Sequence, residues 1–332
     1  MAKINIGKIR GLQEIATPGG VFIMCAMDHR GSLKAMIEKE QPEDEADYQE
    51  LVDYKLELCQ ALAPYSSAVL LDPNYGAAQC ISSGVLPGGT GLLVSIEATG
   101  YKNTRKGRIT SLLKNWTVGK IRRMGASAVK LLVYFRPDLS EVANRQLKTI
   151  RNVAEECLKY DIPLLVETQT YPTQNEDSKT SKFSALKPQL VIETARQITS
   201  LPIDILKSEF PADLKYESDG TKLLQYCKQL DEASKVPWVI LSAGVEYEEF
   251  RKEVEIACSA GASGFLGGRA IWQEALHFTD KKDRRKFLST TVVDRLKELA
   301  EIATKYAVPW YRKRGLQANE LAVVRDNWYV NY

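Results

Sequence analysis

Ala128-Val-Lys-Leu-Leu-Val-Tyr-Phe135 is a nearly continuous apolar run that is broken by a single lysine. An apolar run of this length, without polar alternation, is typical of a strand that is covered on both faces. A helical pattern over 139–160 follows it, and a second apolar run, Pro163–Tyr171, follows the helix. A strand, a helix and a second strand in this order predict a parallel pair joined by a right-handed crossover.

The same unit recurs in both directions along the chain. Six more apolar runs lie at 22–28, 68–73, 91–97, 205–211, 238–244 and 264–270, and further helical patterns lie at 45–62, 189–199, 220–233, 247–260 and 289–306. Strand–helix alternation repeated eight times predicts an α/β protein with a (β/α)8 TIM barrel. We expect a single domain over 1–332, with an N-terminal extension at 1–20 and a C-terminal tail at 307–332. A doubly wound open sheet is the alternative fold.

Composition and charge exclude several classes of protein. The net charge of +3 is spread along the chain, so we expect no nucleic-acid partner. No segment approaches 18 consecutive apolar residues and the first ten residues lack a secretory core, which predicts a cytoplasmic protein without a membrane partner. The six cysteines are dispersed and indicate free thiols, and two histidines are too few for a three-histidine zinc site.

The barrel fold makes a prediction about function, because barrel enzymes carry their active sites at the carboxyl ends of the strands. Polar residues follow or interrupt the eight apolar runs at those ends: Asp28, His29 and Arg30, then Asp72, Glu97, Lys130, Glu167, Lys207 with Glu209, Ser242, and Arg269. Charged side chains inside buried strands are costly unless they are used. We interpret the inner set as catalytic, and we favour structural roles for Asp72, Glu97 and Glu209.

Lys207 is the candidate nucleophile. It is a lone cation in the apolar run Ile205–Pro211, where burial disfavours the ammonium form, and a second lysine, Lys130, is expected in the same barrel mouth. A neutral amine attacks carbonyl carbons and forms a Schiff base. Glu167 is a candidate for moving protons during that step, and Asp28 is a candidate to accept a hydroxyl proton from the substrate.

The seventh and eighth strands predict a phosphate site. Ser242 and Gly244 end one strand, and Gly268 and Arg269 end the next. TIM barrels often hold a phosphate at the loops after these two strands, and arginine offers a fixed fork of donors. A phosphate site beside an imine-forming lysine indicates a phosphorylated ketose as the small-molecule partner.

Together these residues resemble a known family, the class I tagatose-1,6-bisphosphate aldolases. The resemblance runs from about residue 20 to residue 275 and rests on Cys25-Ala-Met-Asp-His-Arg-Gly31, Leu70-Leu-Asp-Pro-Asn-Tyr-Gly76, Ala128-Val-Lys-Leu-Leu-Val-Tyr134, Leu206-Lys-Ser-Glu-Phe-Pro211, Leu241-Ser-Ala-Gly-Val245 and Gly267-Gly-Arg-Ala-Ile-Trp272. It implies an aldolase that releases dihydroxyacetone phosphate and an aldehyde, without a metal or another cofactor, and a homo-oligomer, expected to be a dimer.

Carried over by position, Lys207 resembles the family's Schiff-base lysine. Asp28, Lys130 and Glu167 match its acid/base and electrostatic positions, and Ser242 and Arg269 match its ketone-side phosphate site. A related aldolase of 6-deoxy-6-sulfofructose 1-phosphate shares these residues, so it remains an alternative. A sugar-phosphate-sensing protein without turnover is the alternative from another class.

The group that meets the other end of the substrate is less well defined. His29 and Arg30 are candidates, and so is the basic loop at 102–108. His29 departs from the glutamine expected beside the aspartate in tagatose aldolases, so the resemblance leaves open whether the distal anion is a phosphate or a sulfonate. We expect the terminal Tyr332 to belong to a packed or frayed tail.

Overall fold

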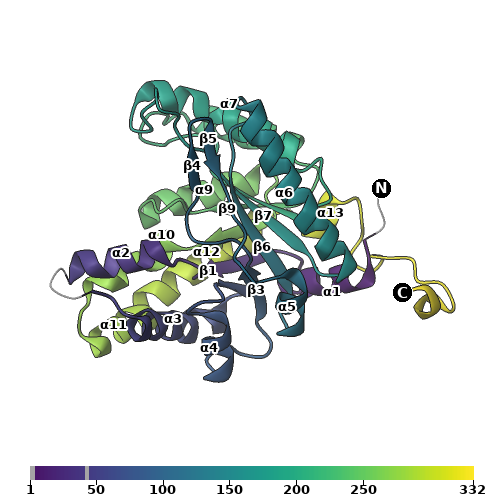
Figure 1. Ribbon diagram of the computed structural model, residues 1–332, viewed down its shortest axis with the longest axis horizontal. Coiled ribbons are helices and arrows are strands. Elements are labelled where there is room, and N and C mark those ends of the chain that lie inside the picture. Colours follow the sequence, from purple (N-terminus) through teal and green to yellow (C-terminus); the bar gives the residue numbers. More distant parts are fainter. Residues whose placement is uncertain (1–3, 42–44) are drawn as a thin grey trace.

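Eight parallel strands close into a barrel in the computed structural model, which describes residues 4–41 and 45–332 (Figure 1). The first strand pairs with both the last and the second, with Phe22 opposite Gly264 and Met24 opposite Ala68, so no open edge remains on either. This closure confirms the predicted (β/α)8 barrel and excludes the open sheet. In barrel order the strands are β1 (Phe22–Ala26), β2 (Ala68–Leu71), β3 (Gly91–Ser95), β6 (Ala128–Tyr134), β7 (Leu164–Gln169), β8 (Ile205–Ser208), β9 (Trp238–Leu241) and β10 (Gly264–Gly267).

Helices surround the barrel. In chain order they are α2 (Gly31–Glu40), α3 (Tyr48–Leu62), α4 (Ala77–Ser82), α5 (Val118–Arg123), α6 (Ser140–Lys159), α7 (Ser181–Ile198), α8 (Gly220–Ala233), α9 (Tyr247–Ser259), α10 (Arg269–Trp272), α11 (Lys281–Phe287) and α12 (Val293–Tyr306). All eight predicted strands exist, and each is shorter than expected, chiefly at its carboxyl end. The helix expected at 189–199 begins earlier, at Ser181, and carries Pro188 inside it.

One element of the fold lies in a region that the sequence suggested was a loop. After β3 the chain forms an antiparallel hairpin of β4 (Lys102–Thr104) and β5 (Gly107–Ile109) before it reaches α5. The hairpin stands at the same end of the barrel as α2 and α10, which follow β1 and β10 (Figure 1). It therefore lies at the carboxyl ends of the strands.

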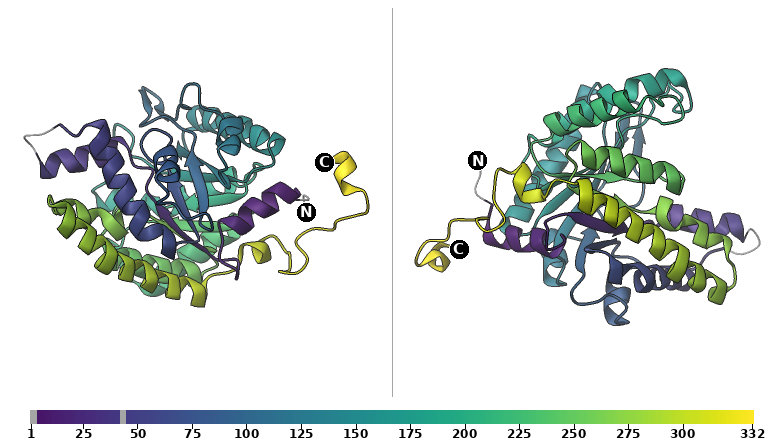
Figure 2. Two further views of the ribbon diagram at one scale, coloured as in Figure 1. Left: turned by 90° about the horizontal axis from the view of Figure 1, so that it is seen from below. Right: turned by 180° about the vertical axis from the view of Figure 1, so that it is seen from behind.

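The opposite end of the barrel is closed by the two ends of the chain. Leu12 of α1 (Ile6–Glu14) and Trp310 of α13 (Trp310–Lys313) are buried in one cluster with inward side chains of the strands. The predicted N-terminal extension and C-terminal tail thus both contribute to the core, because the floor of a barrel needs apolar side chains to exclude water. Beyond α13 the chain leads away from the body beside α1 (Figure 2). There the Tyr332 hydroxyl donates to Asp161, in the turn before β7.

Candidate active site

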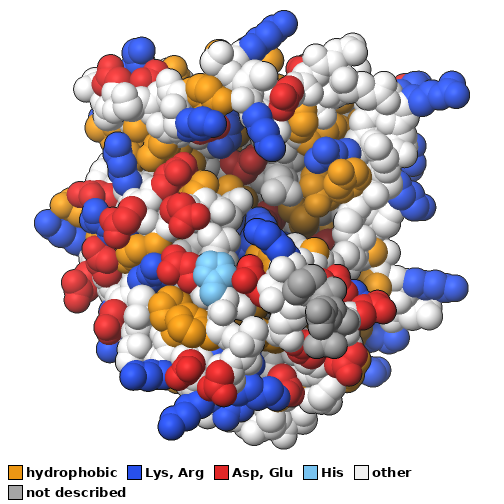
Figure 3. All heavy atoms as spheres, turned by 90° about the vertical axis from the view of Figure 1, so that its left-hand side faces the viewer, with side chains coloured by type: hydrophobic (Ala, Val, Ile, Leu, Met, Phe, Trp, Pro, Cys, Tyr) orange, Lys and Arg blue, Asp and Glu red, His pale blue; other side chains and the backbone are white. Residues whose placement is uncertain are grey.

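The site begins where the inward-facing side chains change from apolar to charged. Ala128, Leu165 and Ile205 belong to the inner apolar cluster of the barrel. Because side chains alternate along a strand, the residues two positions further on, Lys130, Glu167 and Lys207, face the same interior one layer nearer the mouth. Figure 3 views that end of the molecule and shows a hollow near the centre of the face, bordered by basic, acidic and hydrophobic side chains.

Glu167 joins the two buried lysines. Its Oε2 lies 3.0 Å from Lys207 Nζ and 3.1 Å from Lys130 Nζ. Glu167 and Lys207 are directly opposite each other on β7 and β8, so the strand register alone holds this pair together. The Lys207 and Lys130 side chains are 5% and 2% exposed, which keeps both amines inside the barrel.

Lys130 is surrounded by carboxylates. It donates to Asp28 Oδ2 at 2.7 Å and to Glu97 Oε1 at 2.7 Å, and Glu97 Oε2 in turn accepts from the Leu132 backbone N–H at 3.1 Å. The sequence suggested that the two lysines would repel each other. In the structure three carboxylates surround one of them, so Lys130 is a fixed cation and Lys207 is the amine with the fewer acidic partners.

These contacts set the charges of the inner groups. Burial opposes charge on Lys130, but Asp28, Glu167 and Glu97 outweigh it and hold the pKa of Lys130 well above its usual value. Burial likewise favours the neutral forms of Asp28 and Glu167, but the ammonium groups of Lys130 and Lys207 outweigh it and lower the pKa of both carboxyl groups. Asp28 and Glu167 are therefore proton acceptors at neutral pH.

The predicted phosphate residues gather beside this cluster. Ser242 Oγ accepts a hydrogen bond from the Gly268 backbone N–H at 3.2 Å, which ties the loops after β9 and β10 together. Gly244 has a φ of 80°, and a Cβ built there would lie 2.9 Å from the Arg269 guanidinium carbon. Arg269 is partly buried, and this burial lowers the pKa of its guanidinium against the opposing charges of Glu167 and Asp28.

His29 lies beside the loop that carries Gly268. A Cβ added to Gly268 would meet its ring at 2.9 Å, and its ring packs edge-on to Trp272 with centroids 5.2 Å apart. Burial, together with the charge of Arg269, lowers the pKa of His29 to about 3 although Asp28 opposes the shift. Its Nδ1 is buried and has no hydrogen-bond partner among the residues that the structure describes. His29 is thus a neutral imidazole beside the Gly268 loop.

Arg30 is buried and its guanidinium is hydrogen-bonded to neighbouring loops. It is 8% exposed, and its Nη1 donates to the Glu97 carbonyl oxygen at 3.0 Å and to Asn74 at 3.5 Å. These contacts link the loop after β1 to the loops after β2 and β3. They give Arg30 a structural role and do not support the predicted role as a distal anion ligand.

Two acidic residues that we expected to be structural have fixed partners outside the cluster. Asp72 is fully buried and pairs with Lys55 Nζ at 2.6 Å. Lys55 also donates to the carbonyl oxygens of Met27 and His29 at 2.5 Å each, so it holds the backbone on both sides of Asp28. Glu209 accepts from the backbone N–H of Thr170 at 2.6 Å.

Two residues beside the lysine cluster, Lys55 and Glu97, were missed or undervalued by reasoning from the sequence. Lys55 lies in a helical pattern with nothing to mark it, and its partners come from distant loops. Glu97 was interpreted as structural, yet it contacts Lys130 directly. Arg108 belongs to the basic loop at 102–108, and nothing in the sequence distinguishes it from the other basic residues there. In the structure its guanidinium lies against the rings of Tyr101, Tyr134 and Tyr171.

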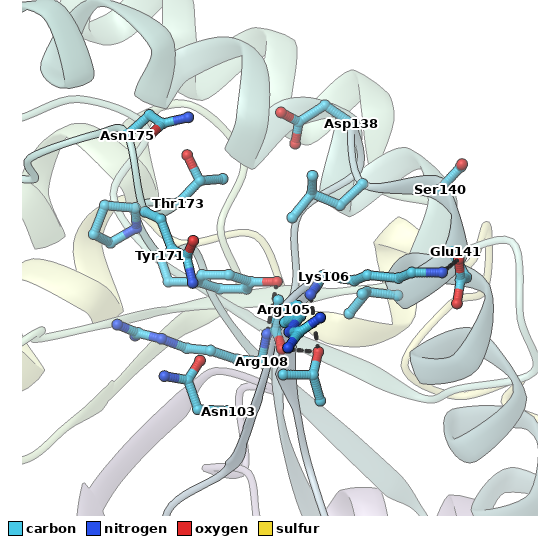
Figure 4. Close-up of a pocket in the computed structure, with 16 residues that line it drawn as sticks. Asn103, Arg105, Lys106, Arg108, Asp138, Ser140, Glu141, Tyr171, Thr173 and Asn175 are labelled. Carbon is cyan, nitrogen blue, oxygen red and sulfur yellow. Dashed lines mark hydrogen bonds and ion pairs between the residues drawn. The ribbon is translucent and has the colours of Figure 1, made fainter.

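A separate cavity lies beside the β4–β5 hairpin. It measures about 670 Å³ and opens between the β4–β5 hairpin, the start of α6 and the segment after β7. Arg105, Lys106 and Arg108 line it on the hairpin side, and Tyr171 and Asp138 line it on the barrel side (Figure 4). The cavity therefore belongs to the same end of the barrel as Lys207.

Metal ligands, membrane-spanning helices, cysteines and the second histidine were the subject of further expectations from the sequence. Within 4–41 and 45–332, no three His, Cys, Asp or Glu side chains are grouped as metal ligands, and no helix is long and apolar enough to cross a bilayer. All six cysteines are buried free thiols, as predicted. His277 is exposed, its side chain 3.8 Å from Glu40.

Comparison with known proteins agrees with this geometry. The model of the family described as DeoC/LacD family aldolase matches residues 22–274. A tagatose 1,6-diphosphate aldolase of Enterococcus faecalis is 32% identical over 94% of this chain and 99% of its own length, and one of Staphylococcus aureus is 33% identical over 95% and 100%. A solved Schiff-base-forming fructose-1,6-bisphosphate aldolase is 20% identical, covers 85% of this chain and 96% of its own, and has a TM-score of 0.55.

Proposed function

The chain belongs to the DeoC/LacD family of aldolases, and from that premise we propose that it cleaves tagatose 1,6-bisphosphate to dihydroxyacetone phosphate and glyceraldehyde 3-phosphate through a Schiff base on Lys207. The observation that carries the proposal is the Glu167 carboxylate, which contacts the buried amines of both Lys207 and Lys130. Membership in an aldolase family favours an enzyme over a sugar-phosphate sensor without turnover.

Formation of the Schiff base requires an uncharged amine and a proton carrier. Glu167 lies 3.0 Å from Lys207 Nζ and accepts its proton, and the free amine attacks the C2 carbonyl carbon of the open-chain ketose. The same carboxyl group then returns the proton to the carbinolamine oxygen, which leaves as water. Lys130 stays charged throughout, so it stabilises the carboxylates without competing as a nucleophile.

Cleavage of the carbon–carbon bond needs a base at the C4 hydroxyl. Asp28 accepts that proton as the C3–C4 bond breaks, the aldehyde leaves, and the bonding electrons pass into the iminium to form an enamine. Protonation of the enamine at C3 and hydrolysis of the imine release dihydroxyacetone phosphate and regenerate Lys207. Asp28 can fill this role because its lowered pKa keeps it ionised and because its Oδ2 is fixed 2.7 Å from Lys130 Nζ.

Ser242, Gly244, Gly268 and Arg269 bind the C1 phosphate in this proposal. Arg269 supplies the charge, and Gly244 leaves room for the guanidinium where any other side chain would meet it. Binding the phosphate here aligns C2 with the Lys207 amine, which converts binding energy into orientation.

Borohydride trapping tests the proposal most directly. We expect dihydroxyacetone phosphate and borohydride to add a reduced adduct to Lys207, detected by peptide mass spectrometry, and we expect Lys207→Met to remain unlabelled. Cleavage of tagatose 1,6-bisphosphate should persist in EDTA, since no step uses a metal. An unlabelled Lys207 in folded protein would overturn the mechanism. The dimer implied by the resemblance stays a prediction for sedimentation analysis.

A further inference from the structure

Arg108 has no role in the chemistry described so far. We propose that its guanidinium binds the anionic group at the end of the substrate remote from C1, and that it selects ketose 1-phosphates that carry a second anion at C6. The inference rests on the proposed function, because it assigns the second end of the same substrate. The ligand chemistry is a phosphate or sulfonate group on a six-carbon chain.

The hairpin that carries Arg108 is fixed in place. The Arg108 backbone N–H donates to the Tyr171 hydroxyl at 3.1 Å, and Thr104 Oγ1 donates to the Gly107 carbonyl at 2.7 Å. Gly107 has a φ of 138°, and a Cβ there would lie 2.4 Å from the Tyr171 hydroxyl. Tyr171 is 2% exposed, so the hairpin rests on a buried anchor at the end of β7. Arg108 is therefore held where it lies before any ligand arrives.

The guanidinium itself is held by aromatic rings and has no acid to neutralise it. Its carbon lies 4.4 Å from the ring centre of Tyr101, 5.0 Å from that of Tyr171 and 5.9 Å from that of Tyr134. Across the described part of the chain, no carboxylate lies within ion-pair distance of Arg108. Cation–π contacts orient a guanidinium without satisfying its N–H donors, so they leave it able to bind an anion.

The acidic residues that line the cavity do not neutralise Arg108, because each of them forms an ion pair with another cation. Lys106 pairs with Glu141 at 2.5 Å (Figure 4). Asp138 pairs with Arg136 at 2.6 Å. The cavity, at about 670 Å³, is within the usual size range of small-molecule sites, roughly 300–1,000 Å³. An anion in it would meet Arg108 without displacing an existing ion pair.

Arg108 is also at a suitable height above the reacting amine. Tyr134, whose ring contacts it, lies two residues beyond Leu132 on β6, and Leu132 is level with Glu167. With a rise of about 3.3 Å per residue, Tyr134 stands roughly 7 Å further toward the mouth than the Glu167–Lys207 pair. The remote end of a hexose attached at C2 has to extend over a comparable distance.

The other candidates for this role lie elsewhere. His29 contacts the Gly268 loop, at the C1 phosphate end, and Arg30 is committed to the Glu97 carbonyl. Neither presents an unpaired charge toward the β4–β5 hairpin. Among the basic residues of the β4–β5 hairpin, Arg108 is the one that combines partial burial, fixed orientation and the absence of an acidic partner in the described residues.

The test compares ketose 1-phosphates that carry a second anion at C6 with one that does not. We expect Arg108→Gln to lower kcat/KM for tagatose 1,6-bisphosphate or 6-deoxy-6-sulfofructose 1-phosphate by roughly 10- to 100-fold, mostly through KM, since that is the range for losing hydrogen bonds to a charged group. Cleavage of tagatose 1-phosphate, which lacks the second anion, should change less than about 3-fold on the same scale. Fructose 1,6-bisphosphate and 6-deoxy-6-sulfofructose 1-phosphate share their C4 configuration, so the wild-type preference between these two identifies the anion as phosphate or sulfonate.

Lys102→Gln is the matched control, because it removes from the same hairpin an exposed cation that does not line the cavity. This control should leave kcat/KM for all three substrates nearly unchanged. An equal loss for all three substrates in Arg108→Gln, or no loss for any, would overturn the assignment. Labelling of Lys207 by dihydroxyacetone phosphate and borohydride, measured in the same variant, separates this result from failure of the proposed function, since that ketone has no distal group.

Discussion

Glu167 and Lys207 are opposite each other in the register of β7 and β8, and Glu167 Oε2 accepts a hydrogen bond from Lys207 Nζ at 3.0 Å. The backbone ladder of a barrel is among its most rigid parts, so this pair is aligned before a substrate binds. A nucleophile and its proton acceptor on adjacent strands need no loop movement to meet.

The role of Asp28 separates bond cleavage from Schiff-base formation. We expect Asp28→Asn to lower kcat for cleavage by about 10²- to 10⁴-fold, the usual contribution of a general base. Borohydride trapping of Lys207 with dihydroxyacetone phosphate should persist, because that ketone carries no C4 hydroxyl. Parallel measurement of turnover and labelling checks this, and loss of both together would contradict it.

Lys130 controls the pH dependence of the site. It lowers the pKa of Asp28 and Glu167, so both are ionised at neutral pH. In Lys130→Met these pKa values rise, and we expect the acid limb of kcat/KM to move to higher pH. Removing a buried cation from among three carboxylates should also lower the free energy of unfolding by about 3–5 kcal/mol. A pH–rate profile and urea denaturation measure the two effects, and an unmoved acid limb would contradict the assignment.

Gly244 leaves space for Arg269. In Gly244→Ala the new Cβ would approach the guanidinium carbon to 2.9 Å and displace it, so we expect KM for the ketose 1-phosphate to rise by about 10-fold, equivalent to roughly 1.4 kcal/mol. Gly84→Ala is the control, since Gly84 has a similar φ of 74° and open space around it. Both variants should lose about 1–2 kcal/mol of stability to left-handed strain, but Gly84→Ala should keep a normal KM.

His29 makes the stability of the protein depend on pH in a predictable direction. Its pKa is about 3 in the fold and about 6.5 when unfolded, so below pH 6.5 the unfolded chain binds a proton that the folded chain does not. The contribution of neutral His29 is therefore complete above pH 6.5 and is lost as the pH falls toward 3. In His29→Gln we expect the free energy of unfolding to fall less between pH 6.5 and pH 5 than in the wild type, by about 1–2 kcal/mol.

His277→Gln is the control for that measurement. His277 is the other histidine of the chain, and its side chain is 62% exposed. Its removal should leave the dependence of unfolding free energy on pH unchanged. Equal slopes for wild type and His29→Gln would show that His29 is not kept neutral by the fold.

Several parts of the site followed from local sequence alone. A charged residue inside an apolar run, as at 130, 167 and 207, marks a strand end that opens into a barrel mouth, because nothing else stabilises a charge there. Eight apolar runs with helices between them determined the fold, since strands that are buried on both faces are typical of a parallel sheet covered by helices. The hairpin at 102–109 could not be predicted from the sequence, because its two strands are short and polar and show no alternation of apolar residues.

The sequence by itself therefore determined the barrel and pointed to Lys207 as the proposed reacting amine with carboxylates around it, since burial and strand parity are encoded locally. Only the tertiary structure decided which of these groups lie within hydrogen-bond distance and which lysine is a fixed cation. It also decided that His29 lies by Gly268 and that Arg108 lies among three tyrosines. Those outcomes depend on distances of a few ångströms between loops far apart in the chain. Strand register and loop packing, rather than residue type, determine such distances.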